Sequence, residues 1–286
     1  MSEPAEPAPA AAPPAAVPAP GTAVPARPAP RTTRALVGAF SIDILVAVAT
    51  LMVASVAAAI VWGVWRGVQV AASGQGGKAD AEAIARAIGD PSVLAQMLMV
   101  IAGMSAAALV LYFLRQPATA AERAMSYQFL RRRSTLGWAV LVGVAVFVGN
   151  TALAWLMRQG GIEPAPSNEA MILEASERWP LFLVLFAVVL APMYEELLFR
   201  RVLFGRFLRA GRPWLGLVLS SLAFALFHEV PGLSDNPPGA VLVLLTVYAG
   251  MGAAFAWLYW RTGTLWAPIL AHALNNGLAL ALHGLA

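Results

Sequence analysis

The chain has 286 residues, of which 59% are hydrophobic and 12% charged, and its formal net charge is +4. Soluble domains carry about 25% charged residues, so this composition excludes an ordinary soluble protein. Because the chain has no cysteine, disulfides and thiolate metal sites are excluded as well. The arginines lie between apolar runs, where they indicate membrane topology, and we expect no nucleic-acid partner.

Residues 1–34 are mostly Ala and Pro with a few charged residues. Such a composition cannot bury a hydrophobic core and is typical of disordered chain. No short hydrophobic segment with a cleavage box, as in a signal peptide, precedes the first apolar run. We expect residues 1–34 to form a disordered cytoplasmic tail, residues 35–160 to form N-terminal transmembrane helices, and residues 161–286 to form a second transmembrane unit.

Apolar runs of membrane-spanning length recur through the rest of the chain. A helix needs about 20 apolar residues to cross the hydrocarbon core of a bilayer. The sequence therefore predicts an all-α fold, a polytopic transmembrane bundle of about seven to eight helices. The runs lie at about residues 36–64, 93–114, 135–157, 181–204, 214–229, 239–260 and 264–283.

Arginines are concentrated in alternate connecting segments, which the positive-inside rule assigns to the cytoplasm. The N-terminus is then cytoplasmic. The Ala/Pro-rich, Arg-rich and Lys-poor sequence is typical of a bacterium with a GC-rich genome, so we expect an integral protein of the bacterial cytoplasmic (inner) membrane. The arginines on this side are Arg27, Arg31, Arg34, Arg115, Arg123, Arg131, Arg132, Arg133, Arg206, Arg209, Arg212 and Arg261.

Two adjacent carboxylates, Glu195 and Glu196, interrupt the fourth apolar run. An ionisable group inside a bilayer costs on the order of 2.5–3.5 kcal/mol, so such groups are candidates for a functional role. His228 and His272 also lie in apolar runs. At 1.5 Å per residue, Glu195 and the two histidines lie roughly 15 to 22 Å from the cytoplasmic helix ends. We expect these side chains to meet in the membrane core.

Helical spacing suggests roles for these residues. Glu196 and Arg200 are four residues apart, so they share a helix face and are expected to form an ion pair. Glu195 points away from that pair and is left free to take a proton from water. His272 and Asn276 also share a face, and two neighbouring donors suit a developing oxyanion.

Other polar or helix-breaking residues in the apolar runs are expected to have structural effects. Pro192 and Pro268 each lack a backbone N–H, so we expect local bends near them. Asp43 stands alone in the first run, and we expect it near a polar cavity or the cytoplasmic interface.

Three motifs in order resemble one family. Glu195 to Arg200 reads EExxxR, Phe224 to His228 reads FxxxH, and His272 to Asn276 reads HxxxN. These are the motifs of the CAAX prenyl protease type II and bacteriocin-processing (CPBP or Abi) family of intramembrane proteases. The resemblance covers about residues 180–283 and implies that residues 161–286 are a catalytic core. It also implies a bundle commonly described with eight membrane helices.

The resemblance implies an endopeptidase that hydrolyses a peptide bond at or near the membrane without a covalent intermediate. Glu195 would activate a water as general base, and His228 would help to bind or orient that water. His272 and Asn276 would stabilise the oxyanion. Glu196 and Arg200 would support the first glutamate, and Phe224 would belong to the supporting residues.

Alternative functions remain at this point. No cofactor is expected, but a divalent metal held by Glu195, His228 and His272 is an alternative, because carboxylates and neutral imidazoles are good zinc ligands. The polar cluster is also compatible with a non-catalytic immunity or scaffold protein. A proton-coupled transporter is disfavoured, since no inverted repeat is visible. The expected partners are a peptide or protein substrate and the lipid bilayer, and the oligomeric state is open.

Overall fold

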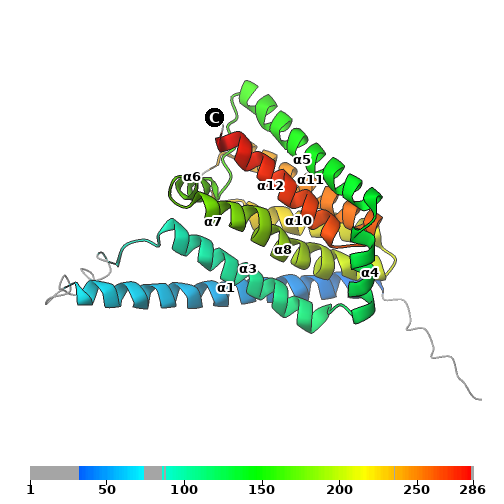
Figure 1. The fold of residues 1–286 in the computed structure, drawn as a ribbon, viewed down its shortest axis with the longest axis horizontal. Coiled ribbons are helices and arrows are strands. Elements are labelled where there is room, and N and C mark those ends of the chain that lie inside the picture. The colour runs from blue at the N-terminus through cyan, green and yellow to red at the C-terminus, as the bar shows by residue number, and fades with distance from the viewer. Residues whose placement is uncertain (1–31, 74–85, 87, 235, 285–286) are drawn as a thin grey trace, which may run out of the picture. The chain divides into compact units, whose positions relative to one another are not determined.

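The computed structural model describes residues 32–73, 86, 88–234 and 236–284 (Figure 1). The described residues form helices and no strand. Of the expected disordered tail, residues 1–31 lie outside the described residues and residues 32–34 lie within them. The first helix, α1 (Thr33–Ala72), starts slightly before the expected boundary, because the Thr32 side chain accepts a hydrogen bond from the backbone N–H of Ala35 and caps it.

Each predicted apolar run forms a helix, which confirms the all-α fold. Among the described residues, five helices are long and apolar enough to cross a membrane, and α10 is a shorter apolar helix. Two short helices, α4 and α6, lie between the predicted runs. Besides α1, the helices are α3 (Val93–Arg115), α4 (Ala120–Leu130), α5 (Arg133–Gln159), α6 (Glu169–Arg178), a composite helix from Pro180 to Arg209, α10 (Pro213–His228), α11 (Pro238–Thr262) and α12 (Trp266–Gly284).

The composite helix departs from α geometry on both sides of Pro192, where the sequence predicted a bend. Wider π-helical turns precede and follow the segment that contains this proline. The helix remains one continuous span. Its parts are α7 (Pro180–Val184), η1 (Leu185–Leu190), α8 (Ala191–Glu196), η2 (Leu197–Phe204) and α9 (Gly205–Arg209).

The expectation of a bend at Pro268 is wrong. Pro268 is the third residue of α12 and lies in its first turn. The N–H groups of a first turn have no intrahelical acceptor, so a proline there removes no hydrogen bond.

The η2 segment lies at the centre of the hydrophobic core. Its side chains Leu198, Phe199 and Val202 are fully buried, and it packs against α3 and α10. The helices α5 and α12 pack closely at Gly143, where an added Cβ would lie 2.7 Å from the carbonyl oxygen of Ala271. This contact fixes the backbone of α12 one residue before His272.

Ion pairs hold the arginine-rich end of the bundle together. Asp43 of α1 is fully buried and pairs with Arg115 of α3, at 2.7 Å, and with Arg206 of α9. Asp43 therefore joins three helices through its two arginine partners.

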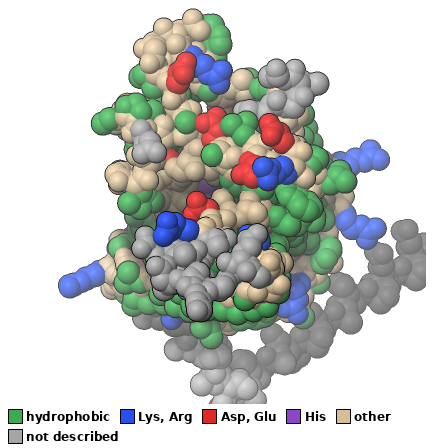
Figure 2. Space-filling model, turned by 90° about the vertical axis from the view of Figure 1, so that its left-hand side faces the viewer, with side chains coloured by type: hydrophobic (Ala, Val, Ile, Leu, Met, Phe, Trp, Pro, Cys, Tyr) green, Lys and Arg blue, Asp and Glu red, His purple; other side chains and the backbone are tan. Residues whose placement is uncertain are grey.

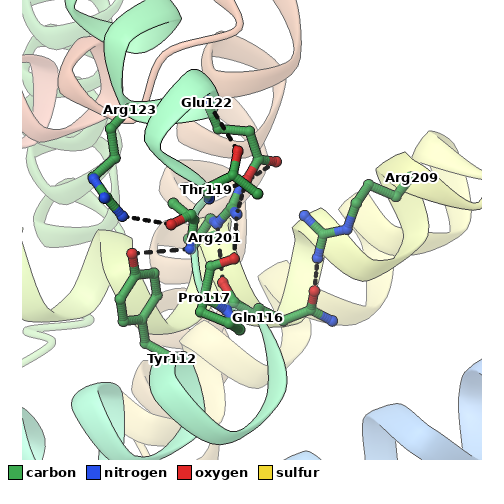
Figure 3. Close-up of polar contacts among 9 residues, drawn as sticks. Tyr112, Gln116, Pro117, Thr119, Glu122, Arg123, Arg201 and Arg209 are labelled. Atoms are coloured by element: carbon green, nitrogen blue, oxygen red, sulfur yellow. Dashed lines mark hydrogen bonds and ion pairs between the residues drawn. The ribbon is translucent and has the colours of Figure 1, made fainter.

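A second contact holds the turn between α3 and α4 against η2 (Figure 3). The Arg201 guanidinium donates to the carbonyl oxygens of Gln116 and Pro117 and to the Glu122 carboxylate, at 2.9 to 3.3 Å. Arg201 directly follows Arg200 in η2. One of these two neighbouring arginines therefore binds the turn, and the other is buried in the core of the bundle.

Candidate active site

The carboxylate of Glu195 lies between the two predicted histidines. Its Oε2 atom is 3.6 Å from Nε2 of His228 and 3.8 Å from Nε2 of His272. The three residues come from α8, α10 and α12, and Glu195 is only 8% exposed. The expectation that these side chains meet is therefore confirmed.

His228 is held at the end of α10 by its own helix and by two aromatic rings. Its Nδ1 atom is 2.8 Å from the carbonyl oxygen of Phe224, one turn earlier. The imidazole lies 4.3 Å from the Phe224 ring and 4.6 Å from the Tyr248 ring, measured between centroids. These contacts direct Nε2 toward Glu195.

His272 is held by the second glutamate. Its Nδ1 atom is 2.9 Å from Oε1 of Glu196, and its ring stacks on Phe255 at 4.9 Å. The other carboxylate oxygen of Glu196 is 2.9 Å from Nε of Arg200, which confirms the predicted ion pair. Glu196 therefore joins Arg200 and His272.

Arg200 is a fully buried cation with an aromatic environment. Its guanidinium lies 4.6 Å above the ring of Phe224 and 5.4 Å from that of Phe255. The guanidinium nitrogens are not aligned for a hydrogen bond to any group in the described part of the chain. Charge attraction to Glu196 and the faces of these rings therefore stabilise the cation.

Asn276 lies one turn after His272, as predicted, and its amide makes two contacts. Its Nδ2 donates to the carbonyl oxygen of Ala187 in η1 at 2.9 Å, and its Oδ1 accepts from Nδ2 of Asn275 at 2.9 Å. One N–H of the Asn276 amide remains for another acceptor.

The hydrogen-bond partners of the histidines fix their tautomers. Carbonyl and carboxylate oxygens only accept, so Nδ1 carries the proton in both rings. In the neutral rings, Nε2 of His228 and Nε2 of His272 are then proton acceptors, and both face Oε2 of Glu195. This cluster can accept protons from a bound molecule.

The metal alternative receives no support from this arrangement. Within the described ranges, no group of three or more His, Cys, Asp or Glu side chains could hold a metal ion. We therefore derive no chemical step through a metal.

A further buried carboxylate, Glu229, follows His228 directly. It accepts hydrogen bonds from Ser167, which precedes α6, and from Ser234, which precedes α11. These bonds hold the α5–α6 and α10–α11 connections together beside the site. Figure 2 shows the end of the molecule that carries α6, where acidic and hydrophobic side chains surround a recess in which a histidine is visible.

Sequence reasoning missed two residues that contact the predicted site. Tyr248 stacks on His228 and Phe255 stacks on His272. Both belong to α11, which carries none of the three motifs. Tyrosine is amphipathic, so Tyr248 within an apolar helix was a weak signal in the sequence.

The fold and the site together define a polytopic helical membrane protein with a buried Glu/His/Asn cluster. Residues 177–278 match the family model described as type II CAAX prenyl endopeptidase Rce1-like. This match agrees with the resemblance drawn from the three motifs and covers the part of the chain that carries them.

Two curated bacterial proteins are similar to the chain. One is the "Putative membrane peptidase YdiL" of Bacillus subtilis, 32% identical over 116 residues, which are 41% of this chain and 43% of that protein. The other is the membrane-embedded CAAX protease MroQ of Staphylococcus aureus, 30% identical over 154 residues, 51% of this chain and 57% of that protein. The chain thus spans about half the length of each relative. No solved structure matches it.

Proposed function

We propose that the protein is a membrane endopeptidase that hydrolyses a peptide bond with a water activated by Glu195. The observation that carries this proposal is the position of Glu195, whose Oε2 faces Nε2 of both His228 and His272 at 3.6 and 3.8 Å. A buried carboxylate between two oriented imidazoles is suited to general base catalysis. The family match and the names of the relatives support a peptide hydrolase.

In the proposed reaction, a water donates one hydrogen bond to Glu195 and the other to Nε2 of His228. Glu195 takes a proton as the water oxygen attacks the scissile carbonyl carbon. The resulting oxyanion accepts hydrogen bonds from the free N–H of Asn276 and from Nε2–H of His272. The intermediate then breaks its C–N bond, and the proton held by Glu195 passes to the leaving amine.

This mechanism requires His272 to carry two protons. Its Nδ1–H is already donated to Glu196, so only a protonated Nε2 can donate to the oxyanion. The Glu196 carboxylate, 2.9 Å from Nδ1, is the counter-charge of that ring when both nitrogens carry a proton. Glu196 is thus a positioning and electrostatic partner of His272.

We further propose that the substrate is a peptide or protein at the membrane, and that the protein lies in a bacterial inner membrane with its N-terminus in the cytoplasm. Secreted peptides and the tails of membrane proteins fit this class. The lipid bilayer surrounds the apolar helices, several of which expose large hydrophobic side chains.

The experiment compares purified wild type with Glu195→Gln on a library of quenched peptides in liposomes, with and without chelator. Cleavage that disappears in the variant and persists with chelator supports the proposal. Loss of wild-type cleavage on chelation would contradict the metal-free mechanism. Equal cleavage by both proteins would overturn the role of Glu195, and a wild type without activity on membrane-anchored peptides would favour the non-catalytic scaffold.

A further inference from the structure

The backbone carbonyl of Ala187 lacks the helical partners that it would ordinarily have. In an α-helix, the N–H of Ala191 would bind this oxygen, but in η1 it binds the carbonyl of Phe186 instead. In a continuing π-turn the N–H of residue 192 would bind it, but residue 192 is proline and has no N–H. The π-turn and Pro192 together leave this carbonyl open.

The open carbonyl receives a side chain from another helix. Nδ2 of Asn276 on α12 donates to the oxygen of Ala187 at 2.9 Å. An unsatisfied backbone group costs several kcal/mol in a hydrocarbon environment, so a polar partner is strongly favoured here. The bond connects α12 to the segment that immediately precedes Glu195.

The same bond fixes the Asn276 amide. Its nitrogen is held by Ala187 and its oxygen by Nδ2 of Asn275, which is itself 3.7 Å from the sulfur of Met251. With both ends held, the direction of the second N–H is fixed as well. That N–H belongs to the residue one turn after His272.

We propose that Pro192 is a positioning residue for the active site. By removing the N–H that would bind the Ala187 carbonyl, Pro192 reserves that oxygen for Asn276 and so holds the Asn276 amide beside His272. The effect of Pro192 on catalysis rests on the proposed function. The hydrogen-bond arrangement does not, and it is testable by stability alone.

The test is a double-mutant cycle with Pro192→Ala and Asn276→Ala. In the wild-type background, loss of the amide leaves the carbonyl unsatisfied, and we expect the thermal midpoint to fall by about 2–6 °C. Pro192→Ala supplies an N–H that can reach the carbonyl. In that background Asn276→Ala should lower the midpoint by less than half as much.

Pro268→Ala is the matched control, because Pro268 lies in the first turn of α12, where the N–H has no helical acceptor. In the Pro268→Ala background the effect of Asn276→Ala should be unchanged. Full additivity with Pro192→Ala would overturn the proposal. If Asn276→Ala does not accumulate, Asn276→Asp, which cannot donate from its side chain when ionised, replaces it in the same cycle.

Kinetics separate positioning from a merely structural effect. Pro192→Ala should lower kcat about tenfold or more with KM nearly unchanged, whereas Pro268→Ala should retain both. Unchanged kcat in Pro192→Ala would contradict the catalytic part. If the wild type cleaves no peptide, the proposed hydrolase activity fails, while the coupling between Pro192 and Asn276 in the thermal midpoints still decides the arrangement.

Discussion

Glu196 contacts two partners in the core of the helical bundle, Arg200 through one oxygen and His272 through the other. Neither Glu196 nor Arg200 has access to solvent, since their side chains are 0% and 1% exposed. The pair brings two charges to a depth where each alone would be strongly disfavoured. Its main functional consequence is the orientation of His272.

Removing one member of this pair should be costly. Glu196→Gln leaves the Arg200 charge buried without a counter-charge, and we expect a loss of about 3–5 kcal/mol in the free energy of unfolding. Adding Arg200→Met should recover much of this loss, measured by chemical denaturation, because the unpaired Arg200 charge is then removed. Activity should not recover, since His272 still lacks its carboxylate.

Glu174 and Arg178 provide the control, because they have the same spacing but are 42% and 67% exposed. Glu174→Gln should change the free energy of unfolding by less than about 1 kcal/mol. If Glu174→Gln lowered the free energy of unfolding as much as Glu196→Gln, burial of the ion pair would not explain the effect.

Glu122, which lies outside the membrane spans, is expected to make the stability of the fold depend on pH. The hydrogen bond from Arg201, together with that from the Thr119 backbone, lowers the pKa of Glu122 below its usual value of 4.5. Its stabilising contribution is therefore complete above about pH 4.5 and is lost as the pH falls through the lowered pKa. The difference in thermal midpoint between wild type and Glu122→Gln should be constant from pH 7 to 5 and shrink toward pH 3. A difference that does not shrink would refute this assignment.

At the scale of helices, the contact between α5 and α12 depends on Gly143. An added methyl group there would meet the Ala271 backbone at 2.7 Å, whereas Gly149 on the same helix faces open space. We expect Gly143→Ala to lower the free energy of unfolding by about 1–3 kcal/mol and to impair cleavage, because His272 follows Ala271. Gly149→Ala should be close to wild type in both assays, and equal effects of the two substitutions would count against this packing.

The sequence predicted the helices well because run length and hydrophobicity are local properties. The pair of Glu196 and Arg200 also followed from local spacing. The contact between Glu196 and His272 spans 76 positions, and nothing local indicates which face of α12 meets α8. The π-turns were missed because an extra residue leaves no periodic trace in a uniformly apolar segment.

The short helix α4 was missed for a different reason. It is not apolar, so the length and hydrophobicity of apolar runs give no signal for it. Thr119 and Glu122 form a capping box at its start, which is a sequence signal for a helix N-terminus. The arrangement of Ala187, Pro192 and Asn276 could not be predicted, since it depends on both a π-turn and a tertiary contact.

At the scale of the whole molecule, the arginine pattern predicts that α4 lies on the cytoplasmic side and α6 on the opposite side. Because the chain has no cysteine, single cysteines can be introduced without removing native ones. Gln128→Cys on α4 and Ala170→Cys on α6 are both exposed positions. In intact cells an impermeant maleimide should label only Ala170→Cys, and both variants should react after lysis. The reverse labelling would contradict the proposed orientation.

The most direct test of the central claim is the rate of peptide cleavage by Glu195→Gln in liposomes, relative to wild type and to Glu177→Gln. Glu177 is exposed on α6 and serves as a matched carboxylate away from the cluster. If Glu195 activates the water, its amide variant should lose at least about 10²–10⁴-fold in kcat while remaining folded, and Glu177→Gln should retain wild-type activity. A Glu195→Gln protein that cleaves at the wild-type rate would show that Glu195 is not the base.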